Sequence, residues 1–165
     1  MILGIDPGLA NTGWAVLQSR IETEKWDNNA VDYKLIDCGV LKTKISDGSA
    51  ERLGQIYEEV ERLIKKYGVK ELALETLFFA KNAKSAIKVA EAIGVIKICG
   101  FKNDVEVYGY TPLQIKMALV GYGRAEKEQV ELMVRNMLDL EEEIKPSHAS
   151  DAVAVGLTHG FTVRF

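Results

Sequence analysis

Residues 2–6 read ILGID, a short apolar run that ends in an acid and is followed at once by Pro7 and Gly8. An apolar run of this length, bounded by turn residues, predicts a buried strand that leads into a turn. A second run of the same kind, LALE, occupies residues 72–75. We therefore build the expected fold outward from two buried strands, each of which ends in a carboxylate.

The elements around these strands follow from hydrophobic periodicity and turn residues. We expect strands at 2–5, 13–21, 33–43, 70–75 and 105–110, and helices at 53–67, 82–100, 112–119, 126–138 and 147–165. Gly68 is the expected C-cap of the first helix, and the polar stretch 22–32 is an expected hairpin loop. This order predicts an α/β fold, a five-stranded mixed sheet with helices on its faces. The strand at 70–75 should lie beside the first strand and parallel to it.

The composition is that of an ordinary globular protein. With 165 residues, 47% of them hydrophobic and 27% charged, a mainly disordered chain is excluded and one domain over residues 1–165 is expected. No apolar run reaches the roughly 18 residues of a membrane-spanning helix, and the apolar start is too short for a signal peptide. Cys38 and Cys99 lack the spacing of a disulfide framework or zinc site, which favours a cytoplasmic location.

Charge is unevenly distributed along the chain. A net charge of −3 argues by itself against a nucleic-acid-binding protein. However, the segment from Phe78 to Lys127 carries +4 and the remainder −7. A basic middle on an acidic body is compatible with a local site for a polyanion, and equally with an ordinary solvated surface.

The two acids that end the buried strands are the first candidate site. If the strands are parallel neighbours, about 4.8 Å apart, then Asp6 and Glu75 stand together at the carboxyl edge of the sheet. Two carboxylates there repel each other and raise a pKa, and a divalent cation would remove that repulsion. The alternative is that each acid merely ends a strand beside solvent.

The last predicted helix begins SHASDA at residues 147–152 and adds two more candidates. His148 and Asp151 are spaced i and i+3, so they share one face of the first turn. Small apolar residues follow and should pack this helix closely on the sheet, with the polar pair near the sheet edge. Taken alone, the acid could simply favour the helix dipole. His159 is about 16 Å further along the helix and is expected to be a packing residue.

Asp6, Glu75, His148 and Asp151 together offer hard oxygen donors and one imidazole. Two Mg²⁺ ions held by such a set suit in-line displacement at a phosphodiester. The imidazole shifts the preference towards softer ions, so Mn²⁺ is expected to substitute.

Four stretches of the sequence resemble the RuvC-type Holliday junction resolvases of the RNase H-like superfamily. They are MILGIDPGLANTGWAV at 1–16, ALETLFFAKNAKSAIKVAEAIGV at 73–95, YTPLQIKMALVGYGRAEKEQV at 110–130 and SHASDAVAVGLTH at 147–159. The resemblance implies an RNase H-like fold and a homodimeric endonuclease that nicks two opposing strands of a four-way DNA junction. It places the family's metal ligands on Asp6, Glu75, His148 and Asp151, although many members carry Asp where this chain has His148.

The resemblance also implies DNA contacts. Lys116 and Lys127 match lysines near the scissile phosphate, where they would bind phosphate or steady charge in the transition state. Phe78 matches an aromatic residue thought to stack on an unpaired base. Further DNA contacts are assigned to the basic residues Lys81, Lys84 and Arg124. Each lysine could instead be a solvated surface residue, and Phe78 could be part of the core.

The helix expected at 82–100 carries more apolar residues than one contact needs, because its charged stripe of Lys84, Lys88 and Glu91 is narrow. The surplus indicates a second buried contact, either a two-fold dimer interface or another helix of the same chain. A dimer suits the chemistry, since a four-way junction with two-fold symmetry needs two active sites. A RuvA–RuvB-type branch-migration complex is a further expected partner.

Three other functions remain open on the sequence alone. A nucleotide-binding protein of the actin, Hsp70 and sugar-kinase class has a similar first hairpin, but that architecture needs two such domains, and ATP binding would discriminate. A non-catalytic junction-binding homologue would bind without nicking. A related nuclease could act on RNA–DNA hybrids or on tRNA-processing substrates.

Overall fold

The structure is a computed structural model that describes residues 1–20, 32–76 and 83–163. The strands are β1 (Ile2–Asp6), β2 (Asn11–Arg20), β3 (Asp32–Lys42), β4 (Glu71–Glu75) and β5 (Glu106–Tyr110). The helices are α1 (Ser49–Tyr67), α2 (Ala83–Lys102), α3 (Pro112–Val120), α4 (Lys127–Met137) and α5 (Ser147–Thr162). The predicted order of elements is confirmed.

Helix boundaries differ from the prediction where the local signal is weak. Helix α1 begins four residues before the predicted start at Leu53, because its first three residues are exposed and its first turn lacks the large apolar residues that marked the rest. It ends as predicted, with Gly68 in the left-handed conformation at φ 61° and its N–H donated to the Ile64 carbonyl. Helix α3 starts at Pro112 behind a capping box formed by Thr111 and Gln114.

The five strands form one mixed sheet in the order β3-β2-β1-β4-β5. Strand β2 is antiparallel to both β1 and β3, whereas β4 is parallel to both β1 and β5. Ile5 of β1 is opposite Leu74 of β4. The predicted parallel pairing of the two acid-ending strands is therefore confirmed.

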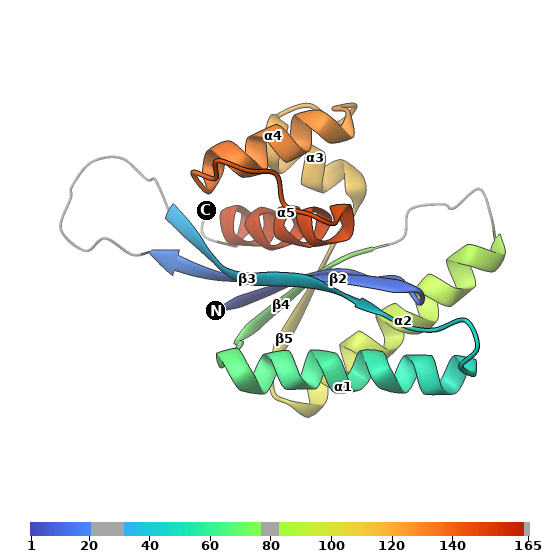
Figure 1. Ribbon diagram of the computed structural model, residues 1–165. Helices are drawn as coiled ribbons and strands as arrows, with labels where there is room; N and C mark the ends of the chain where they lie inside the picture. Colours follow the sequence, from blue (N-terminus) through green and yellow to red (C-terminus); the bar gives the residue numbers. More distant parts are fainter. Residues whose placement is uncertain (21–31, 77–82, 164–165) are drawn as a thin grey trace.

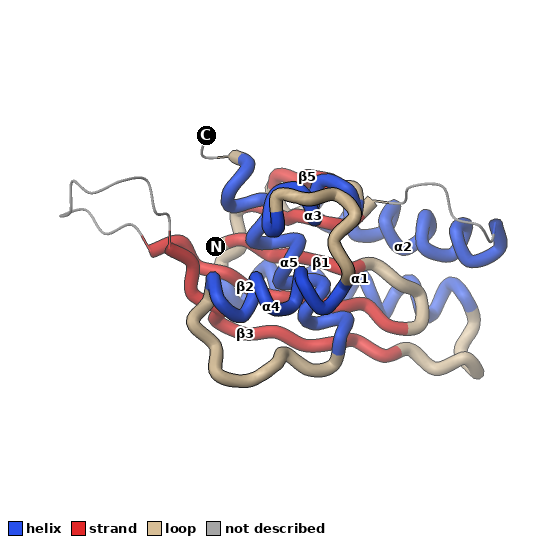
Figure 2. Tube along the Cα trace, turned by 90° about the horizontal axis from the view of Figure 1, so that it is seen from above, coloured by secondary structure: helices blue, strands red, loops and turns tan. Residues whose placement is uncertain are grey.

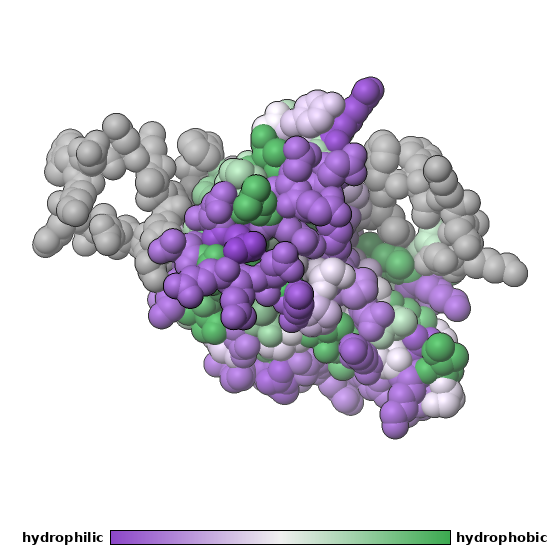
Figure 3. Space-filling view, turned by 45° about the horizontal axis from the view of Figure 1, so that its top comes forward, coloured by the Kyte–Doolittle hydropathy of each residue, from purple (hydrophilic) through white to green (hydrophobic). Residues whose placement is uncertain are grey.

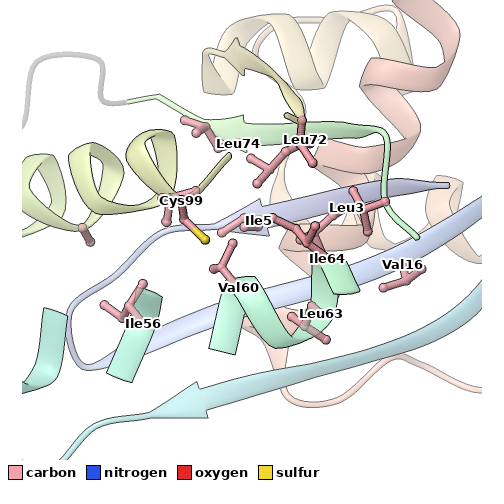
Figure 4. Close-up of a cluster of buried hydrophobic side chains, with 14 of the residues drawn as sticks. Leu3, Ile5, Val16, Ile56, Val60, Leu63, Ile64, Leu72, Leu74 and Cys99 are labelled. Atoms are coloured by element: carbon pink, nitrogen blue, oxygen red, sulfur yellow. The ribbon is translucent and has the colours of Figure 1, made fainter. Parts of the chain in front are cut away.

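Helices cover both faces of the sheet. Figure 1 shows α1 and α2 below it and α3, α4 and α5 above it, and in Figure 2 the latter three lie over the strands. The lower core joins β1 and β4 to α1 and α2, and the side chains drawn in Figure 4 include Leu3, Ile5, Leu72 and Cys99. The upper core packs the other side of the same strands against α5, with Ile2 and Ala73 facing it.

Helix α5 lies unusually close to the sheet because glycines face it. A Cβ added to Gly4 would come 2.2 Å from the Ala152 carbonyl oxygen, and one added to Gly13 would come 1.9 Å from the carbonyl oxygen of His148. No side chain fits at those distances, so backbone packs on backbone along the helix. This close packing fixes where the first turn of α5 meets the end of β1.

Among the described residues, the helices are too short or too polar to cross a membrane.

Candidate active site

The acids that end β1 and β4 lie side by side on the face covered by α5. Side chains alternate along a strand, and Ile2 and Ala73 point toward α5, so Asp6 and Glu75 point the same way. Both follow directly after the paired residues Ile5 and Leu74. The predicted juxtaposition of the two carboxylates arises from strand register alone.

The first turn of α5 brings His148 and Asp151 to Asp6. The Nδ1 atom of His148 lies 2.7 Å from Asp6 Oδ2. Asp6, His148 and Asp151 each offer one donor atom, and these three atoms lie within 4.8 Å of one another. We call these three residues the ligand cluster. Their spacing and their mixed oxygen and nitrogen donors fit the binding of a divalent cation.

Glu75 lies beside the ligand cluster, although it is not one of the three residues grouped by distance. With Lys116, Lys127 and Asp151 it lines a hollow of about 290 Å³, which we call the lysine hollow. Burial raises the pKa of Glu75 from its ordinary 4.5 to about 7, and the negative charges of Asp6 and Asp151 add to the effect. The four predicted ligands therefore form one electrostatically coupled group.

The charges of the neighbouring residues partly offset one another. Burial raises the pKa of Asp6, although its hydrogen bond with His148 acts in the opposite direction. Lys127 places its ammonium 2.8 Å from Asp151 Oδ2. Partial burial alone would lower the pKa of Lys127, but this hydrogen bond and the nearby carboxylates raise it overall. The site thus combines several carboxylates with a firmly protonated lysine.

Of the other residues predicted to contact DNA, only some line the lysine hollow. Lys116 of α3 lines the lysine hollow, as Lys127 does, whereas Arg124 is exposed between α3 and α4 and does not line it. Phe78 and Lys81 lie outside the described residues. The backbone of Lys84 belongs to α2, but its side chain also lies outside the described part.

His159 is fully buried, in agreement with its expected packing role. Its Nδ1 lies 2.8 Å from the Tyr110 hydroxyl and its Nε2 lies 3.3 Å from Glu71 Oε2, and its ring packs against Tyr108. The imidazole thus links α5 to strands β4 and β5, away from the ligand cluster.

One buried charge was missed by the sequence analysis. Arg52 of α1 is only 8% exposed and donates from Nε to the Thr43 hydroxyl at 2.8 Å. Its position one residue before the apolar stripe of α1 was the available signal, but such a position is usually solvated.

The surface above the sheet is mostly polar. Figure 3 shows hydrophilic side chains over much of this face, with separate hydrophobic patches between them. Exposed apolar residues of α3 and α4 and of the connection between them are Leu113, Met117, Tyr122 and Leu132.

The chain is similar in sequence and in structure to known proteins. Residues 2–159 match the family described as crossover junction endodeoxyribonuclease RuvC. The RuvC crossover junction endodeoxyribonuclease of Halothermothrix orenii is 43% identical over 164 residues, which are 99% of this chain and 94% of that protein. Thermus thermophilus RuvC superposes with a TM-score of 0.89 at 37% identity, covering 99% of this chain and 95% of that one. T. thermophilus RuvC in complex with a Holliday junction substrate superposes with a TM-score of 0.86 at 34% identity, covering 99% and 94%.

Proposed function

This chain belongs to the RuvC family of crossover junction endodeoxyribonucleases, which are metal-dependent nucleases, and we propose that it resolves four-way DNA junctions by paired, symmetric nicks. Each nick is the hydrolysis of one phosphodiester bond and leaves a 5′-phosphate end that can be ligated. Such a reaction serves recombination and DNA repair. The observation that carries the proposal is the ligand cluster beside two lysines at the edge of the sheet.

The donor set suits divalent metal ions. Buried carboxylates repel one another here, and a cation would relieve the repulsion that raises the pKa of Glu75 to about 7. Asp6, Glu75, His148 and Asp151 would hold two Mg²⁺ ions, which prefer oxygen donors. The imidazole of His148 should let Mn²⁺ substitute. When bound, such ions activate a water molecule and neutralise charge that develops on the phosphate.

The two lysines would position the scissile phosphate. The ammonium of Lys127 lies at hydrogen-bonding distance from Asp151, so a phosphate bound at the ligand cluster would lie close to it. Lys116 lines the same hollow. Two ammonium groups on one side of the reacting phosphate favour the transition state, in which negative charge increases on the oxygens. Stacking by Phe78 on an unpaired base remains a prediction from family resemblance.

A homodimer would supply the second active site. Ile87, Ile98 and Phe101 of α2 are 61%, 54% and 78% exposed, and their spacing puts them on one helix face. Gly94 lies between them, and a Cβ added there would meet nothing within 4 Å. An apolar stripe of this kind suits an isologous contact with a second copy of the chain. Presentation of the junction by a RuvA–RuvB-type complex is a further part of the proposal.

Cleavage of an end-labelled synthetic four-way junction tests the function. Matched linear duplex and RNA–DNA hybrid serve as controls, each with Mg²⁺, Mn²⁺ or EDTA, and with Asp6→Asn beside the wild type. We expect paired nicks only in the junction, lost with EDTA and with Asp6→Asn. Nicking of the RNA–DNA hybrid instead would contradict the proposed substrate. Tight junction binding without nicking in either metal would contradict the proposed catalytic activity.

A further inference from the structure

A second hollow also borders the ligand cluster and shares no lining residue with the lysine hollow. It has a volume of about 390 Å³ and is lined by the turn after β1, from Gly8 to Asn11, by Arg52 and Lys88, and by His148. We call it the arginine hollow. Because His148 belongs to both the ligand cluster and this hollow, the two are directly adjacent. Figure 1 shows the starts of α1, α2 and α5 at this same end of the sheet.

The arginine hollow contains the buried charge of Arg52, which has no acidic partner among the described residues. Arg52 is 8% exposed, and within the described chain the only hydrogen bond of its side chain runs from Nε to the hydroxyl of Thr43. An arginine side chain has five N–H donors and stays protonated at any ordinary pH. A buried guanidinium that lacks both an acid and partners for most of its donors is energetically unfavourable.

The terminal nitrogens of Arg52 are not fully enclosed. Polar side-chain atoms that are fully buried without a partner in the described residues do not include them, and Arg52 is one of the residues that line the hollow. Lys88 of α2 adds a second positive charge, and none of the described lining residues is acidic. Two cations, one of them a planar fork of donors, form a receptor for a phosphate group.

The surrounding turn is held so that Arg52 keeps its position. Thr43 accepts from Arg52 Nε and donates its own hydroxyl to the Leu9 carbonyl at 2.5 Å. Thr12 donates to the Gly8 carbonyl at 2.7 Å, and the Thr43 N–H donates to Ala10 at 3.1 Å. These bonds link the guanidinium to the turn that directly follows Asp6. A group bound by Arg52 would therefore have a fixed position relative to the ligand cluster.

We propose that Arg52 and Lys88 bind a phosphate of the cleaved DNA strand that neighbours the scissile phosphate. The inference rests on the proposed function, because it assigns a site for the same substrate. The strand would then run from the arginine hollow across the ligand cluster to the lysine hollow, with cations on both sides of the bond that breaks. Contact with a flanking phosphate fixes register and orientation and carries no sequence information.

Junction binding in EDTA, where a metal-dependent nuclease does not cut, tests the site at several salt concentrations. Arg52→Gln should weaken binding about 10-fold or more, since hydrogen bonds to charged groups contribute about 1.5–3 kcal/mol. The slope of log K against log[salt] should become shallower by about 0.7–0.9. Lys88→Gln should act in the same direction. Arg62→Gln is the matched control, because Arg62 is an exposed residue of the same helix that is paired with Glu59, and it should leave affinity and slope unchanged.

Junctions with one neutral methylphosphonate at each position flanking the cleavage site identify the phosphate. In the wild type, one flanking position should weaken binding, and Arg52→Gln should remove the sensitivity at that position only. Arg52→Lys retains the positive charge but lacks the planar set of guanidinium donors, and it provides the same test if Arg52→Gln does not fold. Lys88→Gln provides a further test of the same site. A role confined to holding Thr43 would lower the melting temperature and leave the methylphosphonate pattern unchanged.

The outcomes separate this site from the function. If the wild type cuts junctions but the variants keep wild-type affinity, slope and methylphosphonate pattern, the phosphate site is wrong and the function stands. If the wild type neither binds nor cuts a four-way junction, the proposed function fails, and the site falls with it.

Discussion

Replacing Glu75 by glutamine should stabilise the metal-free protein at neutral and alkaline pH, even though it destroys a proposed ligand. Glutamine has nearly the same shape as glutamate but no charge. Burial, together with repulsion from Asp6 and Asp151, raises the pKa of Glu75 to about 7 in the folded protein. The unfolded chain does not hold the carboxyl in this environment, so folding works against ionisation of the group.

The size and pH range of the effect follow from that pKa. At about 1.36 kcal/mol for each pH unit between two pKa values, a rise from 4.5 to about 7 corresponds to about 3 kcal/mol. Because the side chain is partly exposed, solvent screening reduces this to about 1–2 kcal/mol. The folded state binds the proton more tightly, so the penalty is absent below pH 4.5, grows as pH rises, and is complete above about pH 7.

Thermal denaturation in EDTA from near pH 5 to near pH 8 measures the difference. For a domain of this size, 1 kcal/mol shifts the melting temperature by about 2–4 °C. We expect Glu75→Gln to melt about 3–6 °C above the wild type near pH 8, with the gap closing towards pH 5. Glu58→Gln on the exposed side of α1 is the matched control and should show no such pH dependence.

Two results would refute the reasoning. Glu75→Gln could be less stable than the wild type near pH 8, or its advantage could be independent of pH. Either result would mean that the Glu75 carboxylate is not held at a disadvantage by burial and by its acidic neighbours.

Four further predictions concern other parts of the molecule. Mg²⁺ or Mn²⁺ at 100 times its Kd should stabilise the wild type by about 2.7 kcal/mol, and an undiminished thermal shift in Asp6→Asn would exclude Asp6 as a ligand. Lys127→Gln should lower the single-turnover cleavage rate about 10²-fold with little change in junction Kd, so a loss of binding alone would count against its role. Gly4→Ala should destabilise by about 1–3 kcal/mol on thermal melting, because its Cβ would meet the backbone of α5, whereas Gly54→Ala in open space on α1 should not. Phe101→Glu should convert the proposed dimer to monomers in sedimentation, and an unchanged mass would place the interface elsewhere.

The order of elements could be derived from the sequence because the signals are local. Alternation, helical spacing and Gly68 each act over a few neighbouring residues and remain readable in one dimension. The same is true of ILGID and LALE, where an apolar run ends in an acid. Because the carboxyl ends of neighbouring parallel strands meet at a common edge of the sheet, the sequence alone predicts that Asp6 and Glu75 lie together. The His148 and Asp151 pair follows similarly from helical periodicity.

Tertiary structure alone decided how the two pairs meet and which charges are buried. The distance from His148 to Asp6 depends on glycines of two strands that let α5 approach the sheet, and this contact spans almost the whole chain. The burial of Arg52 likewise depends on Thr43 and the turn after β1, so its place beside the apolar stripe of α1 is not enough to predict it. Periodicity reports which face of an element is apolar, whereas the burial of a charge results from packing between elements distant in sequence.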